Sequence, residues 1–310
     1  MTFLKGFAMG AANVVPGVSG GTIALITRIY ERLINALKSF DGAALKMAAG
    51  FRMGELWRKI DGWFLLALGL GVVASILSLA KVLKWGFEDH PTIVWSLFFG
   101  LIAASIPSVG RMIRSWSASV IGLFLAGMLI AVSMAFLSPA SENAGLLYLV
   151  LCGVAAMCSM IIPGLSGSFV LLLMGNYQLV ALNTVNTLRE GNFGEALPIL
   201  IPVAVGAILG LLVLARLLAW LFENHHDKAL GMITGFVAGS LAIIWPWKDS
   251  VVEPFEKGGE VKEKIVGYEN WRLPDFSTAE VWLQLGALVV GIALILVVES
   301  VAKTRGVDAG

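Results

Sequence analysis

The sequence predicts an all-α integral membrane protein built from two inverted-topology repeats. Each repeat is expected to hold a re-entrant broken-helix hairpin followed by three transmembrane helices, and the two repeats together form one membrane domain. Three observations predict this fold: a composition too apolar for a soluble protein, an internal repeat, and a pair of glycine- and serine-rich interruptions within apolar segments.

The composition excludes a soluble globular protein. Of the 310 residues, 58% are hydrophobic and only 14% are charged, whereas a soluble domain carries about 25% charged residues. The formal net charge of +1 gives no indication of a nucleic-acid partner. Cys152 and Cys158 are six residues apart in one apolar segment and fall on different faces of a helix. We therefore expect neither a disulfide nor a metal site.

The internal repeat appears at three offsets whose order is kept along the chain. At an offset of 147 residues, nine positions between Leu4 and Tyr30 are identical to positions between Leu151 and Tyr177. At an offset of 135, "WGFEDH" (85–90) matches "WLFENH" (220–225), and at 164 two glycines of the first half match two of the second. These matches define a first repeat over residues 1–138 and a second over 144–302.

Each repeat contains three apolar runs close to the roughly 20 residues that cross a bilayer. The runs cover 62–86, 92–108 and 116–137 in the first repeat, and 198–221, 229–246 and 279–300 in the second. Only fifteen residues precede Pro16, and as a helix they reach roughly 22 Å, short of a hydrocarbon core about 30 Å thick. We therefore expect the first segment to enter to mid-depth, break and return, although two full crossings stay open as an alternative.

Charge supports this topology with both termini on the cytoplasmic side. In that arrangement 14 of the 22 Lys and Arg residues fall inside, as the positive-inside rule requires. The 247–280 stretch, predicted as a long loop, carries five basic and eight acidic residues, which suits the outer face. An odd number of spans per repeat inverts the second repeat relative to the first, and inverted repeats with broken helices are typical of secondary transporters.

Two motifs interrupt the apolar segments: "PGVSGGT" at Pro16–Thr22 and "PGLSGS" at Pro163–Ser168. Glycine lets the backbone approach a ligand closely, and proline is well suited to start a helix. The start of a helix offers unpaired N–H groups and a positive partial charge, which favour phosphate and other anions. We therefore predict one anion site where two helix starts face each other, formed by Pro16, Gly17, Ser19, Gly20, Gly21, Thr22, Pro163, Gly164, Ser166, Gly167 and Ser168.

The alternative is that these glycines only allow membrane helices to pack closely. A nucleotide-binding P-loop is excluded, because no Gly-Lys-Ser/Thr follows either motif.

The repeats differ just after the motifs, where ionisable residues occur only in the first. Arg28 and Glu31 stand where the second repeat has Gly175 and Gln178. Ionisable residues within a membrane are costly and indicate function. About 9 Å of helix separates Thr22 from Arg28, so we expect Arg28 to contact the bound anion. Anchoring at the cytoplasmic interface is the alternative.

Four residues are candidates for ion coupling or gating. Lys81 and Arg216 occupy matching positions in the two repeats, as gates on opposite sides would, although snorkelling to the head groups also explains them. Glu31 and Arg32 are the other two candidates. His90 and His225 also match and are expected in loops at the ends of spans.

The stretches "ANVVPGVSGGTIALITRIYERLI" and "IIPGLSGSFVLLLMGNY" resemble the paired motifs of the bacterial polyprenyl-phosphate (undecaprenyl-phosphate) transporter family. The resemblance runs over essentially the whole chain. It implies a flippase of the bacterial cytoplasmic (inner) membrane that recycles undecaprenyl phosphate from the outer to the cytoplasmic leaflet by alternating access. We expect no enzymatic activity and no resident cofactor or metal, and as partners this lipid and the surrounding membrane lipids.

Moving a phosphate monoester inward opposes an inside-negative potential by about 2.3 kcal/mol per charge per 100 mV. We therefore expect co-transport of H⁺ or Na⁺, with Glu31 as the proton carrier. Two rival functions stay open: an anion channel or small-anion exchanger, and a lipid-phosphate phosphatase. The phosphatase is disfavoured because the histidines, in "EDHP" and "ENHHDK", are far in sequence from both motifs.

Overall fold

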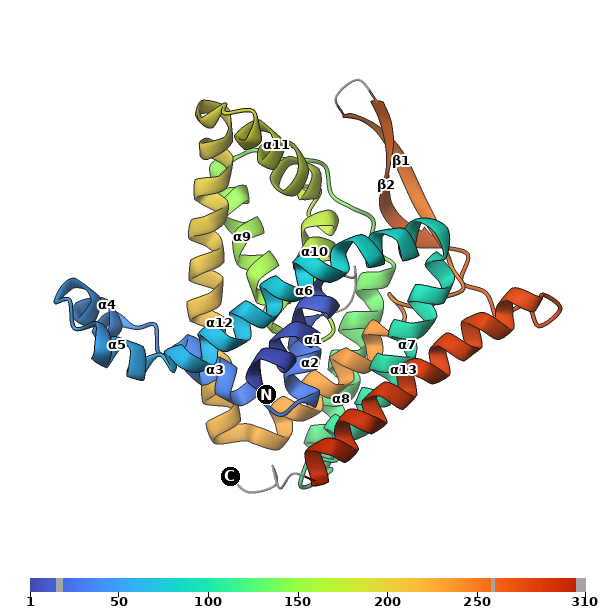
Figure 1. Ribbon diagram of the computed structural model, residues 1–310, viewed down its shortest axis with the longest axis horizontal. Helices are drawn as coiled ribbons and strands as arrows, with labels where there is room; N and C mark the ends of the chain where they lie inside the picture. Colours follow the sequence, from blue (N-terminus) through green and yellow to red (C-terminus); the bar gives the residue numbers. More distant parts are fainter. Residues whose placement is uncertain (15–18, 258–259, 305–310) are drawn as a thin grey trace.

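The computed structural model describes residues 1–14, 19–257 and 260–304, and the chain is mostly helical (Figure 1). Within these ranges, five helices are long and apolar enough to cross a membrane: α6 (Gly62–Asp89), α7 (Pro91–Gly110), α8 (Ala118–Ala135), α12 (Phe193–Ser240) and α13 (Ala279–Thr304). The fold is that of a multi-pass helical membrane protein.

These five helices account for the six predicted apolar runs, because α12 contains two of them. His225 has non-helical backbone angles (φ −141°, ψ 45°) and divides α12 into two helical parts. His90, between α6 and α7, has nearly the same angles (φ −139°, ψ 53°). Each histidine ring meets a tryptophan edge-on, Trp85 at 5.7 Å and Trp220 at 5.5 Å. The two histidines are therefore single-residue breaks between helices, not members of longer loops.

Two shorter apolar helices lead into the motifs. α1 (Thr2–Val14) has 13 residues and α9 (Leu146–Ile161) has 16. At 1.5 Å per residue they extend roughly 20 and 24 Å, less than the thickness of a hydrocarbon core. The seven-residue helices α2 (Gly20–Ile26) and α10 (Gly167–Leu173) follow the motifs. Pro16 and Gly17 lie outside the described residues.

The segments after the two short helices differ. In the first half, α3 (Tyr30–Lys38), α4 (Gly42–Ala49) and α5 (Met53–Lys59) follow, and α4 and α5 project from one side of the molecule (Figure 1). In the second half a π-helical segment, η1 (Gln178–Asn183), continues into α11 (Thr184–Arg189). The predicted loop over 247–280 contains an antiparallel hairpin of β1 (Asp249–Lys257) and β2 (Glu260–Glu269). The helical fold thus carries one small sheet that analysis of apolar runs does not detect.

Glycines place α1 against α6 and α9 against α12 in the same way. A Cβ atom added at Gly6 would overlap the carbonyl oxygen of Leu68, and one added at Gly153 would overlap that of Val203. Gly6 and Gly153 are 147 residues apart, and Leu68 and Val203 are 135 apart, which are the offsets of the sequence repeat. The backbones of α1 and α6 therefore come close at the place that matches the close approach of α9 and α12. Small residues allow such contacts between membrane helices.

The last helix of each half packs against the other half. α8 packs on α12, and α13 packs on α7. A Cβ atom at Gly127 would overlap the carbonyl oxygen of Met232 in α12, and one at Gly291 would overlap that of Leu97 in α7. These glycines differ by 164 residues and their partners by 135, again the offsets of the sequence repeat. The two halves are therefore interlocked by an exchange of helices.

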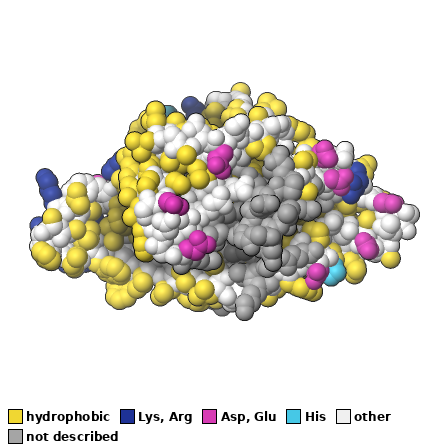
Figure 2. Space-filling model, turned by 90° about the horizontal axis from the view of Figure 1, so that it is seen from above, with side chains coloured by type: hydrophobic (Ala, Val, Ile, Leu, Met, Phe, Trp, Pro, Cys, Tyr) yellow, Lys and Arg dark blue, Asp and Glu magenta, His cyan; other side chains and the backbone are white. Residues whose placement is uncertain are grey.

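Figure 2 shows the molecule from the side of α11 and the β-hairpin. Seen from above, Asp and Glu side chains are scattered across it, and the visible Lys and Arg side chains lie mostly toward its edges (Figure 2). The N-terminus and the end of α13 lie on the opposite side (Figure 1).

Candidate functional site

The described residues of the two motifs are in direct contact although they are more than 140 positions apart. Ser19, only 1% exposed, donates from its hydroxyl toward the carbonyl oxygens of Met160 (3.3 Å) and Ile162 (3.4 Å). The Thr22 hydroxyl, equally buried, accepts a hydrogen bond of 2.9 Å from the Gly164 N–H. The structure therefore brings together the two motifs that the sequence singled out.

Local capping fixes the start of α2. Ser19 is the N-cap residue, and its Oγ accepts from the Gly21 N–H at 3.1 Å, which satisfies one of the donors that a helix start leaves unpaired. The Gly20 N–H donates to Asn13 Oδ1 at 2.7 Å. A Cβ atom at Gly21 would lie 2.7 Å from the Ile161 carbonyl oxygen, so only glycine lets α2 approach the end of α9 this closely.

The second motif has its own polar group. Ser166, the N-cap residue of α10, shares a 2.7 Å hydrogen bond between its hydroxyl and that of Ser168. Gly164 has a left-handed backbone (φ +92°), and a Cβ atom there would lie 3.2 Å from Ser240 Oγ. A Cβ atom at Gly167 would meet the Met160 side chain, so this motif is closely packed as well.

This arrangement suits an uncharged, donor-lined anion site. The described motif residues offer hydroxyl and N–H groups and carry no charge of their own. Ser19 already bonds to the Met160 carbonyl near the end of α9, and Thr22 to the Gly164 N–H of the second motif, so an anion between the motifs would have to replace these bonds. Within the described ranges, no group of three or more His, Cys, Asp or Glu side chains lies where it could hold a metal ion.

The structure places Arg28 at the exposed turn between α2 and α3, outside the buried contact between the motifs. Its backbone is left-handed (φ 55°), and the matching Gly175 of the second half has φ 73°. An L-residue pays a steric cost in this region that glycine does not. Both halves thus have a turn with a left-handed residue at this position, and in the first half that residue is an arginine.

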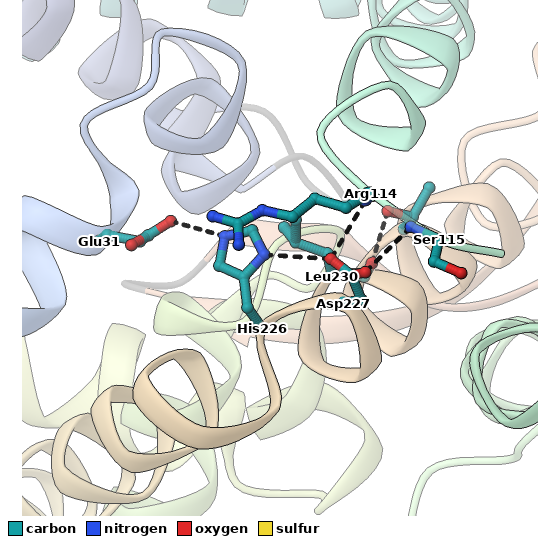
Figure 3. Close-up of polar contacts among 7 residues, drawn as sticks. Glu31, Arg114, Ser115, His226, Asp227 and Leu230 are labelled. Atoms are coloured by element: carbon teal, nitrogen blue, oxygen red, sulfur yellow. Dashed lines mark hydrogen bonds and ion pairs between the residues drawn. The ribbon is translucent and has the colours of Figure 1, made fainter. Parts of the chain in front are cut away.

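Glu31 lies in a polar cluster that connects three parts of the chain (Figure 3). His226 places Nε2 3.3 Å from Glu31 Oε1 and Nδ1 3.4 Å from Asp227 Oδ1. The Asp227 carboxylate also accepts the backbone N–H groups of Arg114 (3.2 Å) and Ser115 (3.0 Å). The cluster therefore joins α3 of the first half to α12 of the second and to the turn before α8.

The other predicted gating residues lie apart from the motif contact. Arg32 makes a two-bonded ion pair with Asp61 (2.7 and 3.1 Å) and lies 4.4 Å from the centre of the Phe64 ring. Arg216 is exposed on α12, and Lys81 belongs to α6 with its side chain outside the described part of the structure. The roles proposed for these residues remain predictions.

In this multi-pass helical membrane protein, two helix breaks contact each other in a buried region between halves that pack alike. Such an arrangement is the architecture of a secondary transporter. The chain belongs to the undecaprenyl phosphate translocase-like family, whose profile matches residues 9–262.

Two relatives support this assignment. A polyprenyl-phosphate transporter of Vibrio cholerae is 36% identical over 307 residues, which is 97% of this chain and 96% of the relative. A polyprenyl-phosphate transporter of Staphylococcus aureus is 28% identical over 258 residues, which is 79% of this chain and 86% of the relative. No solved structure matches the chain.

Proposed function

We propose that this protein transports undecaprenyl phosphate from the outer to the cytoplasmic leaflet of the bacterial cytoplasmic membrane. Family membership and the names of the two relatives support a polyprenyl phosphate as the substrate. The observation that carries the proposal is the buried contact between the two motifs, in which Ser19 and Thr22 bond to backbone groups of 160–164.

In this proposal the phosphate head group binds between the motifs. The hydroxyls of Ser19, Thr22, Ser166 and Ser168 and the N–H groups at the starts of α2 and α10 are the donors, because helix starts favour phosphate. Arg28 neutralises charge at the cytoplasmic end of the path. Its left-handed backbone, at a position filled by glycine in the other half, supports a functional reason for keeping the side chain.

Transport proceeds by alternating access between two inverted repeats, residues 1–138 and 144–302. The matched glycine contacts support the repeat, and the short α1 and α9 support re-entrant segments that end at mid-depth. The excess of Lys and Arg that this topology places on the side of the termini supports their cytoplasmic location.

Inward movement of the charged head group is coupled to H⁺ or Na⁺, with Glu31 as the proton carrier. Glu31 is paired with His226 across the two halves, so its protonation state changes a contact that must break when the halves move. A Glu31→Gln variant is expected to lose proton-coupled transport while it still binds the lipid. The measurement is lipid uptake into proteoliposomes with and without an imposed proton gradient, and an unchanged gradient dependence would contradict this role.

Lipid binding tests the proposed site. Undecaprenyl phosphate binding is measured for the wild-type protein, a Ser19→Ala/Ser166→Ala double variant, and a Ser78→Ala control whose hydroxyl bonds only within α6. We expect the double variant to lose binding and the control to retain it, and inorganic phosphate to compete better than chloride. Unchanged binding in the double variant would show that the motifs only pack helices, and preferential competition by chloride would favour an anion channel or exchanger.

A further inference from the structure

An apolar cavity of about 200 Å³ lies beside the first motif. Its walls come from α1, α2, α7 and α13, and they include Ala8, Ala11 and Ala12 on one side and Ile295 on another. Among the described residues that line it, Thr22 alone has a polar side chain. Its hydroxyl is bonded to the Gly164 N–H, so this residue stands at the boundary between the polar motif contact and the apolar cavity.

The second half has a buried aromatic ring at the position equivalent to Thr22. At the offset of 147 residues, Thr22 corresponds to Phe169, which is only 7% exposed. Phe169 belongs to the same buried cluster as Ala131 and Phe236. These two correspond to the cavity residues Ile295 and Leu101 at the offsets of 164 and 135. The two halves therefore treat one equivalent position in opposite ways.

The exchange of Thr22 for Phe169 is offset in part by that of Ile295 for Ala131, yet an apolar space stays open beside Thr22. Protein interiors leave few voids larger than a water molecule, and each void lowers stability. Phe169 shows that this fold can accommodate a large ring at the equivalent position. The space beside Thr22 is bounded by this small residue of α2 and by three alanines of α1.

We propose that this cavity binds the first isoprenoid unit of the transported lipid, next to the phosphate. The inference rests on the proposed function, because the occupant is the part of a polyprenyl phosphate that is bonded to the head group. The size fits: an apolar cavity of about 150 Å³ holds a six-carbon benzene ring, and an isoprenoid unit has five carbons. Thr22 belongs both to the motif contact and to the cavity wall, so a head group at the motifs lies next to this cavity.

The cavity distinguishes lipids by the shape of their tails, and the hydrophobic effect contributes little to the binding of a prenyl unit there. Lipid tails are as apolar as the cavity walls, so moving a prenyl chain from lipid into protein gains only packing contacts. A branched, unsaturated isoprenoid and a straight acyl chain present different shapes at the carbons nearest the phosphate. The site therefore distinguishes a polyprenyl phosphate from another lipid with the same phosphate monoester.

Filling the cavity tests this site. Ala11→Leu introduces a larger side chain from α1, whereas Leu4→Phe enlarges an exposed residue (67%) of the same helix as a control. Binding to the full-length protein is measured for undecaprenyl phosphate, dioleoyl phosphatidic acid and inorganic phosphate. We expect Ala11→Leu to weaken undecaprenyl phosphate binding at least tenfold and to change the binding of the other two less than twofold, and Leu4→Phe to change none.

A second variant, Ile295→Ala, enlarges the cavity and covers the case in which Ala11→Leu does not fold. It is expected to lower the preference for undecaprenyl phosphate over phosphatidic acid at least threefold. Unchanged preference in the folded variants, or equal weakening of all three ligands, would overturn the cavity site while the transporter proposal stands. Failure of the wild-type protein to bind undecaprenyl phosphate would overturn both.

Discussion

Arg28 combines a strained backbone with an exposed, charged side chain. Replacing it with the glycine found at the matching position 175 removes the steric cost of the left-handed turn, which is on the order of 1 kcal/mol. We expect Arg28→Gly to raise the melting temperature of the purified protein and to reduce lipid transport. Arg28→Lys keeps both the strain and the charge and should retain more transport. A glycine variant with full transport would show that the side chain is dispensable.

Lys248 is a second residue whose surroundings predict a measurable effect. Its side chain is buried, and Nζ lies 4.2 Å from the centre of the Trp95 ring and 4.3 Å from that of Tyr268. Burial lowers the pKa of this amino group from 10.5 to about 7, although cation–π contacts favour the protonated form.

Because the folded protein holds fewer protons at Lys248 than the unfolded chain between pH 7 and 10.5, stability rises with pH across that window. The slope is on the order of 1 kcal/mol per pH unit. Lys248→Met should remove this contribution, so the melting temperature of the wild type should rise relative to that of the variant between pH 7 and pH 10. If the melting temperatures of the two proteins changed equally with pH, the lowered pKa of Lys248 would be contradicted.

At the scale of elements, close helix contacts depend on individual glycines. A Cβ atom at Gly71 in α6 would overlap the Phe3 carbonyl oxygen of α1, whereas one at Gly69, in the same helix, would meet nothing within 4 Å. Gly71→Ala must push α1 and α6 apart, and we expect a loss of about 1–3 kcal/mol. Gly69→Ala should be neutral or stabilise by up to about 1 kcal/mol, because alanine favours helix.

Thermal unfolding of the two alanine variants in the same detergent measures this difference directly. Equal melting temperatures would show that α1 adjusts its position without cost.

Periodic and apolar signals in the sequence predicted the long helices and the approximate place of both motifs. They did not predict the β-hairpin, because its paired strands are charged and leave no long apolar run, nor the π-helical segment after Tyr177. The contact between the motifs was predicted from their repetition alone. The partner of Glu31 was missed, because His226 stands where the first half has Pro91 and the repeat gives no second example of it.

At the scale of the whole molecule, the two halves also meet through ion pairs. Lys38 Nζ lies 2.7 Å from Glu223 Oε1, and Glu31 pairs with His226, so α3 and α12 are joined twice. If the halves move relative to each other during transport, a covalent link across these pairs should stop the cycle.

We therefore expect a Glu31→Cys/His226→Cys protein, with Cys152 and Cys158 replaced by alanine, to lose lipid transport after treatment with a short, reducible bifunctional thiol reagent. Reduction of the link should restore transport. The single-cysteine proteins, treated in the same way, are the controls for modification without linkage. Transport that continues in the linked protein would show that α3 and α12 stay together throughout the cycle.

The exchange of α8 and α13 also has a consequence for biosynthesis. α7 lies in the first half, yet its glycine-mediated partner α13 leaves the ribosome only after α7 to α12 have been made. A nascent chain that has released only the first half exposes the α13-facing side of α7, and the first half reaches its native packing only when α13 arrives. Assembly in the membrane thus waits for α13, and a truncation before α13 leaves both halves incomplete.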